Sequence, residues 1–235
     1  MKKNKNKLNI LAFIPARKNS KRIKDKNLKK INGKELIAYP ILSALKSKYV
    51  NNVFVSTDSK KISDIAKKYN AKVPFLRPKS LATSKSPVIK SIIYSVLKLE
   101  KIYNYFPDYI LTIQPTSPFI TTDLINKSIK SLLKNKVDSL VGLTEVDTTS
   151  HPFNVRVIGN DKNVKFWKAH KHYKSLKIKP PQFYRAGGIY LSSRDTIIRN
   201  KKIEGKKNGF ILMDKLSSID IDTYEDLNLA AKLMK

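Results

Sequence analysis

Residues 8–27 read LNILAFIPARKNSKRIKDKN, and the fold class follows from this stretch. Residues 8–14 form a short apolar run that ends at Pro15, which is typical of a buried strand. Residues 15–27 carry six lysines and arginines and a single acid, Asp25. Ligands of α/β proteins bind beyond the carboxyl ends of strands. The stretch therefore predicts a loop that can wrap a triphosphate, although a solvated lysine-rich loop has the same composition.

The loop has neither of the glycine signatures that common nucleotide-binding folds use. The Walker A pattern GxxxxGK[ST] is absent, and so is the GxGxxG of dinucleotide folds. Phosphate contacts would depend on lysines as point charges and arginines as planar forks.

Short apolar runs alternate with amphipathic segments along most of the chain. Strands are expected at residues 53–56, 109–113, 139–146, 188–192 and 210–213, with a further candidate at 73–76. Helices are expected at residues 36–45, 60–69, 86–101, 121–133, 194–200 and 224–234, and Thr121 or Thr122 is suited to cap the fourth. This alternation predicts an α/β fold with a mainly parallel sheet.

The alternation of expected strands and helices is interrupted between residues 148 and 186. Residues 155–158 and 164–167 are predicted to form a hairpin around Gly159-Asn160-Asp161, and a polar, lysine-rich segment follows. We interpret residues 1–235 as one domain with an inserted element over about 148–186.

The composition limits the possible functions. The 48 lysines and arginines outnumber the 18 acids, giving a formal charge of +30, a balance that first suggests nucleic acid. Only seven of them are arginines and the lysines are spread along the chain, so no specific nucleic-acid site is expected. Cysteine is absent, residues 1–9 are basic and polar and lack the apolar core of a signal peptide, and no apolar run is long enough for a membrane span. We therefore expect a cytoplasmic protein without disulfides or thiolate chemistry.

Six motifs in order give the chain a specific resemblance. They are Ile14-Pro15-Ala16-Arg17 with Ser20-Lys21 and Lys26-Asn27, Val55-Ser56-Thr57-Asp58, Val73-Pro74-Phe75-Leu76-Arg77-Pro78 with Leu81-Ala82-Thr83, Gln114-Pro115-Thr116-Ser117-Pro118, Glu145-Val146 with His151-Pro152, and Ser218-Ile219-Asp220-Ile221-Asp222-Thr223. Together they resemble CMP-sialic acid synthetases and related cytidylyltransferases of acidic sugars. The resemblance implies a Rossmann-like, three-layer nucleotidyltransferase fold whose inserted element mediates a homodimer.

The chain departs from the family pattern within the basic loop. Lys18-Asn19 stands where the family has Gly-Gly, and Arg22 stands where it has a further glycine. Glycines let backbone amides approach phosphate closely, so side-chain cations must replace some of these contacts. The segment from Tyr184 to Tyr190 is also one residue shorter than its family counterpart.

The implied reaction is attack by the anomeric hydroxyl of a nonulosonic acid (sialic, legionaminic or pseudaminic) on the α-phosphate of CTP. It releases pyrophosphate and gives a CMP-sugar for surface polysaccharide or glycoprotein synthesis. Such a transfer needs charge neutralisation and alignment more than a covalent intermediate. The resemblance implies catalytic roles for Arg17, Lys21 and Asp222. It assigns nucleotide contacts to Ala16, Arg17, Ser20, Lys21, Lys26, Asn27 and Arg77, and sugar contacts to Gln114, Gln182 and Arg185.

Asp220 and Asp222 stand two residues apart in an extended segment and therefore point to the same side. Beside a triphosphate, such a pair can hold Mg²⁺, which prefers oxygen ligands. The pattern fits equally well a core formed by Ile219 and Ile221 with solvent-facing acids. The resemblance favours the metal-binding interpretation and makes Mg²⁺ the expected cofactor.

Three alternatives stay open at this point. The donor could be GTP instead of CTP, and the acceptor could be an eight-carbon deoxy-octulosonate. A non-catalytic protein that binds polyanions through its charge would need neither Asp220 nor Asp222, and its binding would weaken steeply with salt.

Lys177 could supply a cation across a dimer, although it also fits a plain surface lysine.

Overall fold

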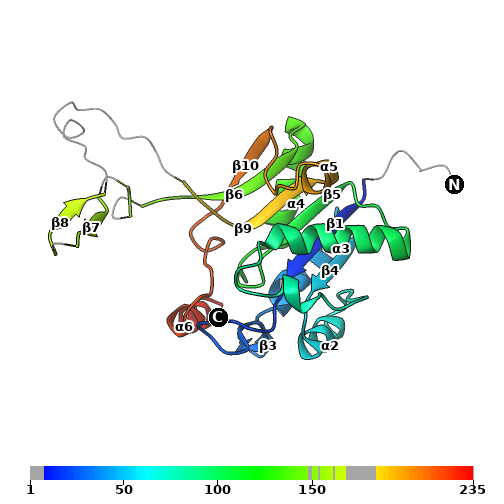
Figure 1. The fold of residues 1–235 in the computed structure, drawn as a ribbon, viewed down its shortest axis with the longest axis horizontal. Helices are drawn as coiled ribbons and strands as arrows, with labels where there is room; N and C mark the ends of the chain where they lie inside the picture. Colours follow the sequence, from blue (N-terminus) through cyan, green and yellow to red (C-terminus); the bar gives the residue numbers. More distant parts are fainter. Residues whose placement is uncertain (1–7, 148–149, 153, 161, 168–183, 235) are drawn as a thin grey trace.

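A computed structural model describes residues 8–147, 150–152, 154–160, 162–167 and 184–234 (Figure 1). No helix in these ranges is long and apolar enough to cross a bilayer.

The centre of the molecule is a six-stranded sheet with the order β10-β6-β9-β5-β1-β4. Its strands are β1 (Ile10–Pro15), β4 (Asn52–Ser56), β5 (Tyr109–Ile113), β6 (Ser139–Glu145), β9 (Tyr184–Ser193) and β10 (Asn208–Leu212). Strand β9 runs antiparallel to both of its neighbours, and all other pairings are parallel. The predicted mainly parallel α/β sheet is confirmed.

Strand β1 is buried on both faces, which explains its continuous apolar run. Ile10, Ala12 and Ile14 belong to one core cluster, which also contains residues of α1 (Ala38–Leu45), α2 (Lys60–Lys68) and α4 (Thr122–Asn135). Leu11 and Phe13 belong to a second cluster with residues of α3 (Val88–Tyr103) and α5 (Arg194–Ile198). Alternate residues of one strand thus face two helical layers, as a three-layer fold requires.

Several helices begin at side-chain caps that the sequence supplies. Thr121 Oγ1 accepts a hydrogen bond from Leu124 N at 3.2 Å, which confirms the predicted cap of α4. Ser59 caps α2 and Ser193 caps α5 in the same way. The last helix, α6 (Tyr224–Leu233), begins with a capping box in which Thr223 and Asp226 bond each other's backbone amides.

A third, smaller cluster anchors the basic loop. Ile23 of that loop is fully buried against Ile221 and Ala230. Ile31 and Leu36 complete the cluster. Ile31 is the last residue of β2 (Lys30–Ile31) and Leu36 directly follows β3 (Lys34–Glu35), and these two strands form a short hairpin. The hairpin turn is Asn32-Gly33 with φ of 44° and 82°, which is the preferred chemistry of a tight hairpin turn.

Strands β7 (Arg156–Ile158) and β8 (Val164–Phe166) form the predicted hairpin, and Figure 1 shows it set apart from the main body. Large apolar side chains are exposed on and beside it, with 77% of Ile158, 64% of Val164 and 62% of Trp167 accessible to solvent. Strand β9 begins at Tyr184, so the last residues of the interval 148–186 belong to the central sheet.

The strand candidate at residues 73–76 was wrong. Lys72 alone bridges Phe54 of the edge strand β4, and the chain then turns away. Pro74 has no amide hydrogen with which to continue the ladder, which is the physical reason for the difference. Two 3₁₀ turns, η1 (Lys26–Leu28) and η2 (Lys79–Leu81), complete the elements of the described residues.

Candidate functional site

A cleft of about 660 Å³ lies at the carboxyl ends of β1 and β5. It contains most of the site residues that the sequence predicted: Arg17, Ser20, Lys21, Lys26, Asn27, Arg77, Gln114, Asp220 and Asp222. They come from four separate segments of the chain, so the fold brings together residues that are far apart in the sequence.

The basic side of the cleft, formed by Arg17, Ser20, Lys21, Asn27 and Arg77, is called the basic wall below. Its loop is held by contacts that need no glycine. Asn27 is buried, and its Nδ2 donates to the carbonyl oxygen of Arg17 at 3.0 Å, which ties the two ends of the loop together. The amide of Lys18 donates to Asp58 Oδ1 at 2.8 Å. These contacts fix the backbone, and the side chains of Arg17 and Lys21 line the cleft.

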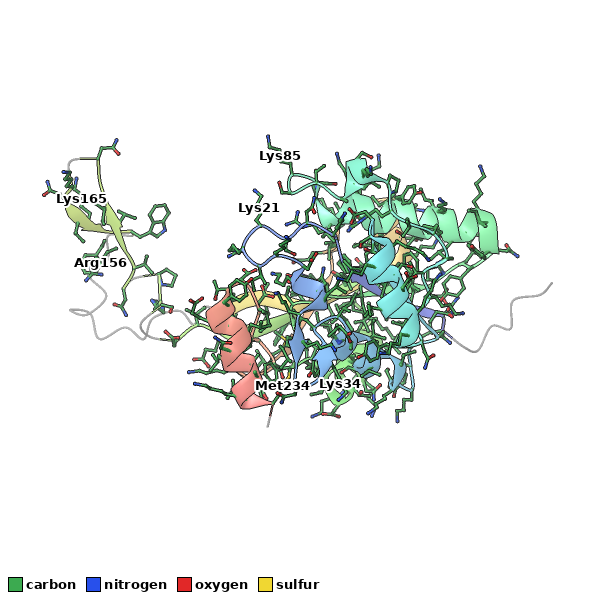
Figure 2. The ribbon with its side chains drawn as sticks, turned by 90° about the horizontal axis from the view of Figure 1, so that it is seen from below. Lys21, Lys34, Lys85, Arg156, Lys165 and Met234 are labelled. Atoms are coloured by element: carbon green, nitrogen blue, oxygen red, sulfur yellow. The ribbon has the colours of Figure 1, made fainter. Side chains whose placement is uncertain are left out.

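Lys21 stands at the outer part of this loop. Figure 2 shows Lys21 and Lys85 projecting from two different loops in the same direction, away from the strands. Lys21 lines the cleft, whereas Lys85 is exposed and is not one of its lining residues. A cation at this position can reach an anionic ligand that enters the cleft from solvent.

Arg77 is the most constrained cation of the basic wall, with 7% of its surface exposed. Its Nη1 donates to Ser91 Oγ at 3.0 Å, while Nε and Nη2 have no hydrogen-bond partner among the described residues. Burial lowers the pKa of Arg77, and the nearby charge of Asp58 acts in the opposite direction. Unpaired donors on a buried charge cost free energy, so this side chain is prepared for a ligand that accepts hydrogen bonds.

Asp220 and Asp222 both line the cleft, and Ile221 between them is fully buried. The extended geometry predicted for this segment is therefore present, with acids toward the cleft and the isoleucine toward the core. Asp222 pairs with two cations: Lys26 Nζ lies 3.0 Å from its Oδ1 and Arg22 Nη2 lies 2.8 Å from its Oδ2. Burial raises the pKa of Asp220, and the neighbouring charge of Asp222 adds to this effect.

This donor set fits Mg²⁺. No group of three or more histidine, aspartate or glutamate ligands occurs in the described part of the chain. Mg²⁺, however, is commonly held by one or two carboxylates together with substrate phosphates and water. A partly desolvated carboxylate pair beside a basic loop matches that pattern, with Arg22 as a competing cation.

A second group of residues, called the β9 wall below, consists of Gln114, Tyr190, Ile203 and Glu204, which line the cleft, and Arg185, which lines an adjoining recess. Arg185 lines a recess of about 100 Å³ that shares Gln114, Tyr190 and Asp220 with the main cleft. Its Nη2 donates to the carbonyl oxygen of Ser218 at 3.1 Å. Gln182, predicted to contact sugar, and Lys177 lie outside the described residues.

Ala16 is not at the cleft surface. Its methyl group is fully buried, and its amide donates to the carbonyl oxygen of Ser56 at 2.9 Å. Ala16 therefore helps to continue the sheet beyond β1, and the structure shows no side-chain route from it to a ligand.

The sequence analysis did not select several residues that line the cleft. A group of hydroxyl residues, Thr83, Ser84, Ser86 and Ser91, lines the cleft together with Arg77. Tyr190 and Glu204 come from β9 and the segment after α5. Three hydroxyl residues at positions 83, 84 and 86, shortly before a helix, were the one available signal.

The profile of the family described as Cytidylyltransferase matches residues 11–235. The chain belongs to this cytidylyltransferase family. The predicted family and the predicted enzyme class, a nucleotidyltransferase, are thereby confirmed.

Members of the family resemble the chain over nearly its whole length. It is 36% identical over 229 residues to the CMP-N,N'-diacetyllegionaminic acid synthase of Legionella pneumophila, with 97% of each chain covered. It is 30% identical to the pseudaminic acid cytidylyltransferase of Campylobacter jejuni, with 96% of each covered. An N-acylneuraminate cytidylyltransferase of Escherichia coli is also 30% identical, but the match spans 52% of that longer protein.

Solved structures share the fold at low sequence identity. CMP:2-keto-3-deoxy-manno-octonic acid synthetase, solved in complex with CTP, superposes with a TM-score of 0.72 at 16% identity and covers 96% of this chain and 98% of its own. The 4-diphosphocytidyl-2C-methyl-D-erythritol synthase of Anaerococcus prevotii gives 0.64 at 16% identity, with 97% and 96% covered. The predicted Rossmann-like nucleotidyltransferase fold is confirmed.

Proposed function

We propose that this cytidylyltransferase transfers the cytidylyl group of CTP to the anomeric hydroxyl of a nonulosonic acid. The products are a CMP-sugar and pyrophosphate. Relatives that match nearly the full chain are named for legionaminic and pseudaminic acids, which supports this class of acceptor.

One observation carries the proposal: three kinds of group converge on a single cleft. The basic loop supplies cations, Arg77 supplies buried donors without partners, and Asp220 and Asp222 supply a carboxylate pair. A nucleoside triphosphate with a divalent cation has the charges that complement all three.

The chain's own residues would bind and align the reactants. Arg17 and Lys21 would neutralise the triphosphate, with Ser20 adding a hydrogen bond. The unpaired donors of Arg77 would bind acceptor atoms of the nucleoside, and Asn27 would keep the loop closed beneath it. Alignment and charge neutralisation of this kind supply most of the rate in phosphoryl and nucleotidyl transfer.

The carboxylates Asp220 and Asp222 would hold Mg²⁺, with Lys26 positioning Asp222. Bound Mg²⁺ would neutralise charge on the triphosphate. Gln114 would contact the sugar, and the guanidinium of Arg185 would pair with the sugar carboxylate.

We further propose a homodimer that acts in the cytoplasm. The hairpin of β7 and β8 exposes apolar side chains away from the body, and a second copy of the chain would remove them from water. Sedimentation of the purified chain tests this, and Ile158→Lys should shift a dimer toward monomer.

The decisive experiment measures pyrophosphate release with Mg²⁺. CTP, GTP, UTP and ATP would be tested against N-acetylneuraminic, legionaminic and pseudaminic acids and against deoxy-octulosonate. Release that requires CTP and one nonulosonic acid is the expected result. A requirement for GTP or for deoxy-octulosonate would correct the donor or the acceptor, and no release from folded protein would sink the proposal.

The alternative of a non-catalytic polyanion-binding protein rests on the charge of +30 alone. It predicts nucleic-acid binding that weakens steeply with salt and is indifferent to Asp222→Asn. The family model of an enzyme matches residues 11–235, so the binding protein is the second candidate.

A further inference from the structure

One carboxylate in the cleft has no role in the reaction described above. Among the described residues that line the cleft, Glu204 is the single acid outside the Asp220–Asp222 pair. It belongs to the segment between α5 and β10, on the β9 wall, with Ile203 and Tyr190 beside it in the cleft lining.

A chain of hydrogen bonds orients the Glu204 carboxylate. Asn208 Nδ2 donates to Glu204 Oε2 at 2.6 Å, and Asn208 Oδ1 in turn accepts from Ser139 Oγ at 2.7 Å. Ser139 is the first residue of β6 and is buried. The carboxylate is thus connected to the rigid sheet, although it stands at an exposed edge of the cleft.

The backbone around Glu204 is fixed on both sides. Ser192 Oγ donates to the carbonyl oxygen of Ile203 at 2.5 Å, and the amide of Gly205 donates to Ser139 Oγ at 2.7 Å. A Cβ atom at Gly205 would lie 2.7 Å from Cβ of Asp138, so only glycine allows this close approach. The position of Glu204 is therefore set by the fold.

The negative charge of Glu204 limits which groups of a ligand can lie beside it. A carboxylate repels the triphosphate and equally repels the carboxylate of an acidic sugar. It accepts hydrogen bonds from hydroxyl and amide N–H groups, which the acceptor sugar carries. The nearby Tyr190 stays a neutral hydroxyl, because burial and then the charge of Glu204 raise its pKa.

We propose that Glu204 is a specificity-determining residue for the acceptor sugar. Its carboxylate accepts a hydrogen bond from a hydroxyl or amide N–H on the sugar, and its charge directs the acid group of the sugar toward Arg185. This inference rests on the proposed function and names a determinant of its acceptor.

The test compares kcat/KM for N-acetylneuraminic, legionaminic and pseudaminic acids in wild type, Glu204→Ala and Glu204→Gln. For the preferred sugar, Glu204→Ala should raise KM by about tenfold or more, since hydrogen bonds to charged groups are among the stronger ones. The KM for CTP should stay within about twofold, and the preference between the sugars should collapse. Glu204→Gln keeps one acceptor oxygen and should fall between the two.

Two further variants separate a specific effect from a general one. Glu225→Ala removes the same charge from an exposed position in the first turn of α6 and should match wild type. Asn208→Ala leaves the carboxylate in place but removes its positioning contact, so it should raise the sugar KM without changing the KM for CTP.

The outcomes distinguish this inference from the proposed function. If wild type turns over no nonulosonic acid, the proposed function fails and this inference fails with it. If wild type is active and Glu204→Ala keeps the same order of sugar preference, the inference alone is wrong. An equal rise in the KM values for CTP and sugar would likewise overturn it, because it would indicate a general disturbance of the cleft.

Discussion

The basic wall and the β9 wall differ in the chemical groups that they present to the cleft. The basic wall presents cations from a loop that is tied down by backbone contacts, and Arg77 is buried there with two donors unpaired. The β9 wall presents an amide, a phenol, an apolar side chain and a carboxylate, with one arginine in a side recess.

This difference separates binding strength from selectivity. A triphosphate carries the same charges in every nucleotide, so cations held in place can supply most of its binding free energy. Sugars of one class differ in uncharged substituents, and discrimination among them needs oriented hydrogen-bonding groups. Variants of the basic wall should therefore change the CTP dependence, and variants of the β9 wall should change the choice of sugar.

The largest loss is expected from Lys21→Ala on the basic wall. Loss of a cation beside the reacting phosphates should lower kcat/KM for CTP by about 100-fold or more, because such groups act mainly in the transition state. Lys85→Ala removes an exposed lysine that projects in the same direction without lining the cleft, and it should leave steady-state rates unchanged. Equal effects of the two variants would show that general positive charge, not position, matters.

Asp222→Asn tests the carboxylate pair, which belongs to neither wall. We expect activity to fall by about tenfold or more, with the Mg²⁺ dependence of the rate shifted to higher concentration. Mn²⁺ binding measured by electron paramagnetic resonance should weaken in parallel. Asp64→Asn, which breaks an exposed pair with Lys60 on α2, is the matched control. An unchanged Mg²⁺ titration would assign Asp222 a structural role.

Arg77→Met should change stability and binding in opposite directions. Removal of a buried, incompletely paired charge should raise the melting temperature of the ligand-free protein by a few degrees, corresponding to about 1–3 kcal/mol. The same change should raise the KM for CTP by about tenfold, because the prepared donors are lost. A lower melting temperature, measured by calorimetry, would mean that Arg77 is fully satisfied without a ligand.

The smallest effect is expected from Arg22→Gly, which restores the glycine of the family pattern. The Arg22–Asp222 pair is largely exposed, with 65% and 35% of the side chains accessible, and such pairs contribute about 0–1 kcal/mol. Removing this competitor should tighten Mn²⁺ binding by less than about fivefold. Lys24→Gly changes the same charge in the same loop without touching Asp222, and an equal effect there would refute the competition.

The sequence predicted the fold well where periodicity and burial agree. Residues 109–113 were expected as a strand and are β5. The hairpin of β2 and β3 was missed because its two-residue strands are too short to show periodicity, although Asn32-Gly33 was a usable turn signal. Residues 73–76 have strand composition, but Pro74 prevents continued pairing.

Site residues were predictable only where they belong to a recognisable sequence motif. Arg17 and Lys21 stand in a recognisable loop, and the structure places both in the cleft. Glu204 lies in no motif, and it reaches the cleft because Ser139, 65 positions earlier in the chain, holds its segment against β6. The burial of Arg77 depends on tertiary packing, including its contacts with Ser91 of α3 and the carbonyl oxygen of Thr57, which local sequence does not encode.

Strand β9 has a consequence for biosynthesis. It is the link between β5–β1–β4 and β6–β10, yet its residues are made about forty positions after β6 ends. Until Tyr184–Ser193 has left the ribosome, the sheet β5–β1–β4 has an unpaired edge at β5 and β6 has no partner strand, because β10 is made after β9. Unpaired strand edges favour association with other chains. The long excursion before β9 therefore sets a period of vulnerability during translation, and the two halves of the cleft meet only when that period ends.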